Sequence, residues 1–114
     1  MHELGIVFHI IKSVEEIGAQ NELTKVSSVT LEIGEVSGIV PEYLTDCWKW
    51  AAAKSALLTE SELKINRIDA VTYCGACGQT YPTVQYAKIC PHCGSDRTWL
   101  LTGNEVCIKE IEAC

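Results

Sequence analysis

Two stretches of the chain carry apolar residues at helical spacing, which predicts two amphipathic helices. The first covers residues 3–19 and begins at the start of the chain. Its apolar positions are Leu4, Val7, Phe8, Ile11 and Val14, and Ile10 and Ile17 widen the apolar face. The second opens at Pro41, because a proline needs no hydrogen-bonded N–H in the first helical turn. We expect it to end between Ala53 and Leu58, with Leu44, Cys47, Trp48 and Ala51 on one face.

Alternation of apolar and polar residues predicts three strands, at 25–34, 62–71 and 104–112. The last two strands flank residues 71–100, so we expect them to pair antiparallel as a hairpin with that segment at its tip. The strand–helix–strand run from 25 to 71 favours a right-handed crossover. The sequence therefore predicts an α+β fold, with two helices on one face of a mixed three-stranded sheet.

Two Cys-x-x-Cys-Gly motifs lie within the segment between the last two strands. They are Cys74-Gly-Ala-Cys77-Gly and Cys90-Pro-His-Cys93-Gly. Two such pairs at this separation are typical of one tetrahedral four-thiolate metal site, with zinc as the usual ion and rubredoxin-like iron as the alternative. Gly78 and Gly94 follow each pair, where positive φ is expected to turn backbone N–H groups toward the sulfurs. We expect a four-cysteine zinc-ribbon module inserted into the α+β domain.

Composition narrows the class of protein. The 114 residues are 47% hydrophobic and carry a net charge of −6, which does not suit nucleic-acid binding because that requires a basic surface. No stretch suits a membrane span or a signal peptide. Seven cysteines, an odd number, suit a reducing cytoplasm. We expect Cys47 and Cys107 to pack as small hydrophobic residues. No nucleophile–base pair or phosphate loop is evident, so an enzyme is not expected.

The first three residues, Met1-His2-Glu3, form a second candidate site. A histidine at position 2 can combine its imidazole with the free α-amine and the intervening amide nitrogen. Such a nitrogen-rich, nearly planar set suits Ni(II) or Cu(II). Glu3 can ligate the metal or simply interact with the positive end of the helix. The alternative is that His2 is an ordinary surface residue and Glu3 a helix-dipole partner. We interpret His9 as a solvated surface histidine.

These features together resemble the HypA/HybF family, the nickel metallochaperones of [NiFe]-hydrogenase maturation. The resemblance rests on Met1-His2-Glu3-Leu4, Leu31-Glu32-Ile33-Gly34 and the two cysteine pairs, and it extends over essentially the whole chain. It implies a nickel-binding domain at 1–70 and 101–114 and a zinc-binding domain at 71–100, inserted before the last strand.

The resemblance also implies roles for residues and partners. Transient Ni(II) would bind His2 with the Met1 amine and nearby backbone nitrogens, and Glu3 would serve as a ligand or a positioning group. Structural Zn(II) would bind Cys74, Cys77, Cys90 and Cys93. The expected partners are a HypB-type GTPase and the hydrogenase large-subunit precursor, with urease maturation factors as a further option. We expect a monomer or weak homodimer. Gly78 and Gly94 stand where some members carry histidine, so acid-responsive remodelling of the zinc site is not expected.

Two other functions fit the cysteine motifs alone. One is a zinc-ribbon adaptor that binds another protein without delivering metal. The other is rubredoxin-like electron transfer, which requires bound iron and a red protein.

Overall fold

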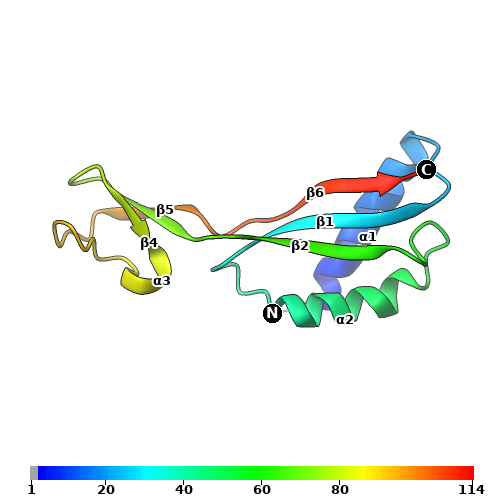
Figure 1. The fold of residues 1–114 in the computed structure, drawn as a ribbon, viewed down its shortest axis with the longest axis horizontal. Coiled ribbons are helices and arrows are strands. Elements are labelled where there is room, and N and C mark those ends of the chain that lie inside the picture. The colour runs from blue at the N-terminus through cyan, green and yellow to red at the C-terminus, as the bar shows by residue number, and fades with distance from the viewer. Residues whose placement is uncertain (1–2) are drawn as a thin grey trace. The chain divides into compact units, whose positions relative to one another are not determined.

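The computed structural model describes residues 3–114, which form three helices and two three-stranded sheets (Figure 1). In chain order the elements are α1 (Glu3–Gln20), β1 (Val26–Gly34), α2 (Pro41–Ala52), β2 (Glu62–Ile68), β3 (Val71–Cys74), β4 (Thr80–Pro82), α3 (Thr83–Tyr86), β5 (Thr98–Thr102) and β6 (Val106–Ala113). Within this described part of the chain, no helix is long and apolar enough to cross a membrane.

The chain divides into two compact units. One comprises the residues up to Glu32, Ile39–Asn66 and Cys107–Cys114, and the other comprises Ile33–Gly38 and Arg67–Val106. The α+β fold with two main helices and a mixed three-stranded sheet agrees with the prediction. The assignment of nickel to 1–70 and 101–114, and of zinc to 71–100, stays a prediction.

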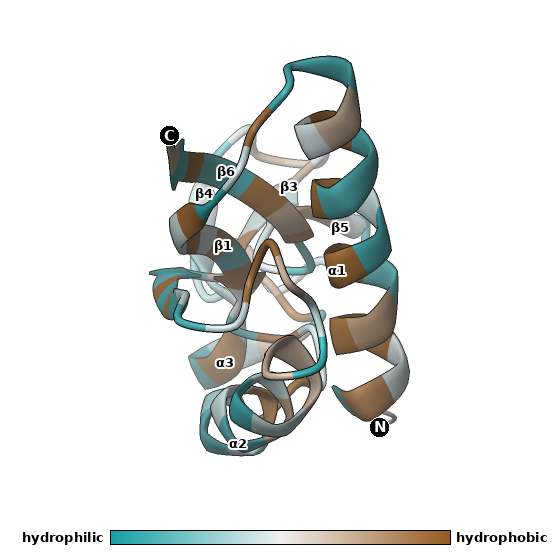
Figure 2. Ribbon diagram, turned by 90° about the vertical axis from the view of Figure 1, so that its right-hand side faces the viewer, coloured by the Kyte–Doolittle hydropathy of each residue, from teal (hydrophilic) through white to brown (hydrophobic). Residues whose placement is uncertain are grey.

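Strand β1 runs parallel to β2, as the predicted crossover through α2 requires. Two hydrogen bonds at opposite ends define this direction: the Val26 N–H donates to the Leu57 carbonyl at 2.9 Å, and the Glu35 N–H donates to the Ile68 carbonyl at 2.8 Å. The partner numbers rise together along both segments, which is the mark of parallel strands. Both α1 and α2 lie on the same face of this sheet (Figure 2).

The predicted hairpin between residues 62–71 and 104–112 is wrong. The order of the first sheet is β2-β1-β6, so β1 separates the two strands (Figure 1). The Cys114 N–H donates to the Lys25 carbonyl and the Gly34 N–H to the Glu105 carbonyl, so β6 is antiparallel to β1. The central position is taken by β1, which carries one charged residue, Glu32, whereas β2 and β6 each carry three. A central strand is paired on both edges, so few charged side chains suit it. Antiparallel pairing occurs instead between β3 and β5 in the second sheet.

The core face of α1 is rotated relative to the prediction. The buried positions are Val7, Ile10, Ile11 and Val14, which are spaced as one helical stripe. Leu4 and Phe8 are exposed, and the Phe8 ring makes an edge contact with Trp50 of α2 at 6.1 Å between ring centroids. The sequence pattern marks all of these residues as apolar but does not show which stripe faces the sheet.

Helix α2 anchors the core through Leu44 and Trp48, both buried as predicted. The Trp48 Nε1–H donates to the Ser61 hydroxyl at 3.1 Å, so its one polar group is satisfied. Cys47 is half-buried. The prediction that Cys107 packs as a small hydrophobic residue is wrong, because it lies exposed on the edge strand β6 with its Sγ 3.7 Å from a Glu32 carboxylate oxygen.

Replacing Leu44 with alanine is expected to destabilise the first unit by about 2–5 kcal/mol, because a fully buried leucine leaves a cavity. Tyr43→Ala is the matched control on the same helix: Tyr43 is 61% exposed, so its loss is expected to change stability by no more than about 0.5 kcal/mol. Urea unfolding followed by far-UV circular dichroism measures both. Equal destabilisation by the two variants would contradict this assignment of the core.

Candidate metal centre

The fold brings all four predicted cysteine ligands together. The sulfur atoms of Cys74, Cys77, Cys90 and Cys93 lie within 4.8 Å of one another. The Cys74–Cys93 and Cys77–Cys90 sulfurs are 3.6 and 3.7 Å apart. A tetrahedral zinc site with Zn–S bonds of about 2.3 Å places its sulfurs about 3.8 Å apart. The donor set therefore fits Zn(II), and it equally fits rubredoxin-type iron.

The two cysteine turns have the same backbone structure. The Gly78 N–H donates to the Cys74 carbonyl, and the Gly94 N–H donates to the Cys90 carbonyl, both at 2.8 Å. Both glycines have a φ of +77°, as the sequence predicts. The His92 N–H points at the Cys90 sulfur at 3.4 Å. Each turn thus holds its sulfurs with a left-handed glycine and directs backbone N–H groups toward the site.

A buried tyrosine supports the site and was not identified from the sequence. Tyr81 on β4 forms a small buried cluster with Cys74 and Cys90. Its hydroxyl donates to the Ala87 carbonyl at 2.9 Å, which ties β4 to the end of α3. An isolated tyrosine in a three-residue strand carries no sequence signal for this role, because the contact with Cys90 is made across the fold.

The thiols of Cys74 and Cys93 differ widely in pKa. Hydrogen bonding from the Cys77 backbone N–H lowers the pKa of Cys74 to about 7. At Cys93 the Ser95 backbone N–H lowers the pKa, but hydrogen bonding to the neighbouring sulfurs and burial outweigh it and raise the pKa to about 12. One thiolate therefore forms readily and a further one is strongly opposed. A divalent cation would remove this opposition, because metal binding displaces thiol protons.

Two residues of the second candidate site, Met1 and His2, lie outside the described residues. Glu3 is described: it is 8% exposed, and its Oε2 accepts a hydrogen bond from the Val40 N–H at 3.3 Å. Val40 is the N-cap of α2 and has no side-chain cap of its own. The Glu3 carboxylate therefore caps α2. His9 is exposed, as expected.

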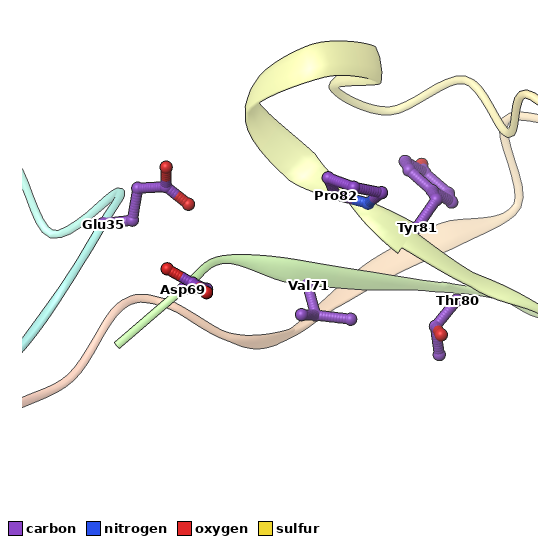
Figure 3. Close-up of a pocket in the computed structure, with 6 residues that line it drawn as sticks. All are labelled: Glu35, Asp69, Val71, Thr80, Tyr81 and Pro82. Atoms are coloured by element: carbon purple, nitrogen blue, oxygen red, sulfur yellow. The ribbon is translucent and has the colours of Figure 1, made fainter. Parts of the chain in front are cut away.

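A hollow of about 470 Å³ lies beside the second sheet (Figure 3). Glu35 and Asp69 lie at one end, and Tyr81 and Pro82 lie toward the other. The Glu35 Oε1 accepts a hydrogen bond from the Ala70 N–H at 2.9 Å, which gives this carboxylate a structural role. Within residues 3–114, the four cysteines are the only group of three or more metal-ligating side chains gathered together.

The chain is similar to known proteins over its whole length. Residues 1–113 match the family model described as "Hydrogenase/urease nickel incorporation, metallochaperone, hypA". A curated relative, Hydrogenase maturation factor HypA of Chlorobium phaeobacteroides, is 36% identical over 111 residues, which cover 97% of each chain. The protein of the same name from Geobacter metallireducens is 33% identical over 112 residues, covering 98% of each chain.

Two solved structures share the fold. One is the solution structure of the Ni metallochaperone HypA from Helicobacter pylori, with a TM-score of 0.75 and 24% identity over 99% of this chain and 97% of that one. The other is titled "Solution structure of HypA protein", with a TM-score of 0.76 and 23% identity over 100% and 97% of the two chains.

Gly94→Ala is expected to weaken zinc binding about tenfold, because a non-glycine residue in the left-handed region costs roughly 1–2 kcal/mol. No heavy atom lies within 4 Å of the added Cβ, so the effect isolates backbone strain from steric contact. Gly94→Asn is the matched control and should lose less, since asparagine tolerates this conformation. Competition with a chromophoric chelator measures both affinities. An alanine variant that binds zinc as well as wild type would contradict the strain argument.

Proposed function

Because the chain belongs to the HypA family of hydrogenase/urease nickel-incorporation metallochaperones, we propose that it binds Ni(II) at its N-terminus and delivers it for [NiFe]-hydrogenase maturation. The match of the family model to residues 1–113 carries this proposal. The family acts in metal delivery and maturation, so the protein is not an enzyme. Its proposed cargo is nickel, and its proposed resident metal is structural zinc.

The four cysteines suit a permanent metal rather than a transferred one. A tetrahedral ion bound by Cys74, Cys77, Cys90 and Cys93 has no open position for a recipient ligand to enter. Cys74 and Cys90 are also buried, which slows access to the ion. The geometry therefore supports zinc as a structural ion, and the nickel must bind elsewhere.

The proposed nickel ligands are His2, the Met1 amine and backbone nitrogen. These donors favour Ni(II), because deprotonation of an amide needs a metal that prefers planar nitrogen coordination. Such a site at a chain end is held by few residues, so a recipient can compete for the ion. Moderate affinity and ready release are what delivery requires.

We assign Glu3 a positioning role rather than a ligand role. Its carboxylate is buried and already accepts the Val40 N–H, at the positive end of α2. It therefore fixes the start of α1, directly after the two proposed ligand residues, against a second helix.

The expected partners are a HypB-type GTPase and the hydrogenase large-subunit precursor, with urease maturation factors as a further option. We propose a cytoplasmic location, because the four-thiolate site and the odd number of cysteines suit a reducing compartment. The competing zinc-ribbon adaptor shares the zinc site and lacks nickel binding. Rubredoxin-like electron transfer requires iron in place of zinc.

His2→Ala is expected to abolish stoichiometric Ni(II) binding while one zinc per chain and the far-UV circular dichroism spectrum stay unchanged. The change removes the imidazole from the proposed planar donor set. His9→Ala is the matched control, since His9 is an exposed histidine of α1, and it should bind nickel like wild type. Elemental analysis and isothermal titration with untagged protein measure both metals.

Nickel binding that survives His2→Ala would overturn the proposed site. Zinc without any nickel uptake by wild type would favour the adaptor, and a red, iron-loaded protein would favour electron transfer.

Two substitutions at Glu3 separate positioning from ligation. Glu3→Gln keeps an oxygen that can accept the Val40 N–H, so nickel affinity should stay within a few-fold of wild type. Glu3→Ala leaves that N–H without its acceptor and should destabilise the first unit by about 1–3 kcal/mol. Nickel titration and urea unfolding measure the two effects. If Glu3→Gln loses nickel as completely as His2→Ala, Glu3 is a ligand.

A further inference from the structure

A hollow of about 300 Å³ lies between the start of α1 and the second half of α2. It is lined by Leu4, Asp46, Cys47 and Trp50, and we call it the α1–α2 hollow. All four residues belong to the first unit. Asp46 is the charged residue among them, so the hollow combines an apolar surface with one carboxylate.

The Trp50 ring is a wall of the hollow and is held in place by two contacts. The Phe8 ring meets it edge-on, with 6.1 Å between ring centroids, and the Lys54 Nζ lies 3.6 Å from its centroid. Aromatic and cation–π contacts of this kind restrict the ring. Trp50 is nevertheless 52% exposed, and Leu4 is 39% exposed. A further apolar group that covered these two side chains would therefore be stabilised.

The two residues that precede Glu3 are within reach of the hollow. Leu4 follows Met1 by three residues, so the two Cα atoms lie no more than about 11 Å apart even when the chain between them is fully extended. On a continuous helix, positions three apart are neighbours on one face. Of Met1 and His2, only Met1 has an apolar side chain. Met1 is therefore the group of this chain that is suited to cover Leu4 and Trp50.

A methionine that carries the free α-amine also matches the chemistry of the lining. Its unbranched thioether adapts to irregular apolar spaces, and its sulfur interacts favourably with aromatic rings such as that of Trp50. The α-amine is mostly protonated at pH 7 when no metal is bound, and the Asp46 carboxylate has the opposite charge. The side chain and the amine of Met1 thus correspond to the apolar and the acidic parts of the hollow.

We propose that the Met1 side chain packs in the α1–α2 hollow, against Leu4 and Trp50, and thereby positions the Met1 α-amine for Ni(II). The positioning rests on the proposed function, in which this amine is a nickel ligand. The amine is bonded to the same Cα as the side chain, so packing of the side chain limits the directions in which the amine can point. Less conformational freedom is then lost when Ni(II) binds, and the affinity rises. In this role the thioether does not bind the metal.

The first test observes Met1 directly. The chain contains one methionine, so an isotope-labelled methionine methyl group gives a single NMR signal. In zinc-loaded, nickel-free protein this signal should be displaced from its position in an unfolded peptide by the ring current of Trp50, and it should show NOEs to the Trp50 ring and the Leu4 methyl groups. Mass spectrometry verifies that Met1 is retained. A signal at the unfolded position without NOEs to Trp50 overturns the proposal.

The second test removes the wall of the hollow. Trp50→Ala should return the Met1 methyl signal to the unfolded position and weaken Ni(II) binding about five- to thirtyfold, which is the equivalent of ordering the backbone of one residue. Trp99→Ala is the matched control, because Trp99 is similarly exposed, at 54%, and does not line the hollow. It should leave the methyl signal and the nickel affinity unchanged. Far-UV circular dichroism and one zinc per chain verify folding of both variants.

Wild-type nickel affinity in Trp50→Ala, although the methyl signal has moved, would overturn the positioning role. An equal loss of affinity in Trp99→Ala would overturn it as well, since the effect would then not depend on the hollow.

His2→Ala distinguishes failure of this inference from failure of the proposed function. The substitution removes the proposed nickel ligand and leaves Met1 and the hollow intact, so the NOEs between the Met1 methyl group and Trp50 should persist when nickel binding is lost. Nickel binding that survives His2→Ala, with these NOEs present, would overturn the proposed nickel site and leave the packing of Met1 standing. Absence of the NOEs in wild type overturns the packing, whatever the nickel affinity.

Discussion

Burial of β1 between two neighbouring strands and beneath two helices is the constraint on which the first unit depends. Val29, Leu31 and Ile33 of this strand are almost completely buried. Ser28 and Thr30 alternate with the apolar residues and are buried too. The Ser28 hydroxyl donates to the Glu112 carboxylate of β6 at 2.7 Å, so its polar group is satisfied. This placement puts β2 and β6 on opposite edges, so the chain leaves the first sheet along one edge and returns along the other.

The second unit is organised differently. Besides Ile33 and Ala70, its buried apolar side chains are those of Cys74, Tyr81 and Cys90, which form one cluster, and several larger ones are exposed. A unit of this size with so small a core needs an additional constraint, and a metal held by the four thiolates would supply it. The four ligands come from two turns separated in sequence, so the same ion would fix the turns and the strands between them.

The two proposed metals differ in the chemistry that holds them. Thiolates enclosed by backbone N–H groups and a buried tyrosine suit an ion that stays in place. The N-terminal donors are few and lie at the end of the chain, which suits an ion that must be released. Glu3 connects the start of α1 to the start of α2 through Val40. Helix α1, which directly follows the proposed nickel ligands in the sequence, is therefore anchored in the fold.

The sequence alone determined the four-thiolate site, the left-handed glycines and the existence of the main elements, because spacing and periodicity are local properties. It did not determine the strand order, the buried stripe of α1, the exposure of Cys107 or the capping of α2 by Glu3. Each of these depends on which distant segment packs against the residue in question. An apolar pattern indicates that a residue is suited to burial, but it does not indicate which segment will bury it. Only the tertiary structure placed β5 at an edge of the second sheet, where its apolar residues are exposed to solvent.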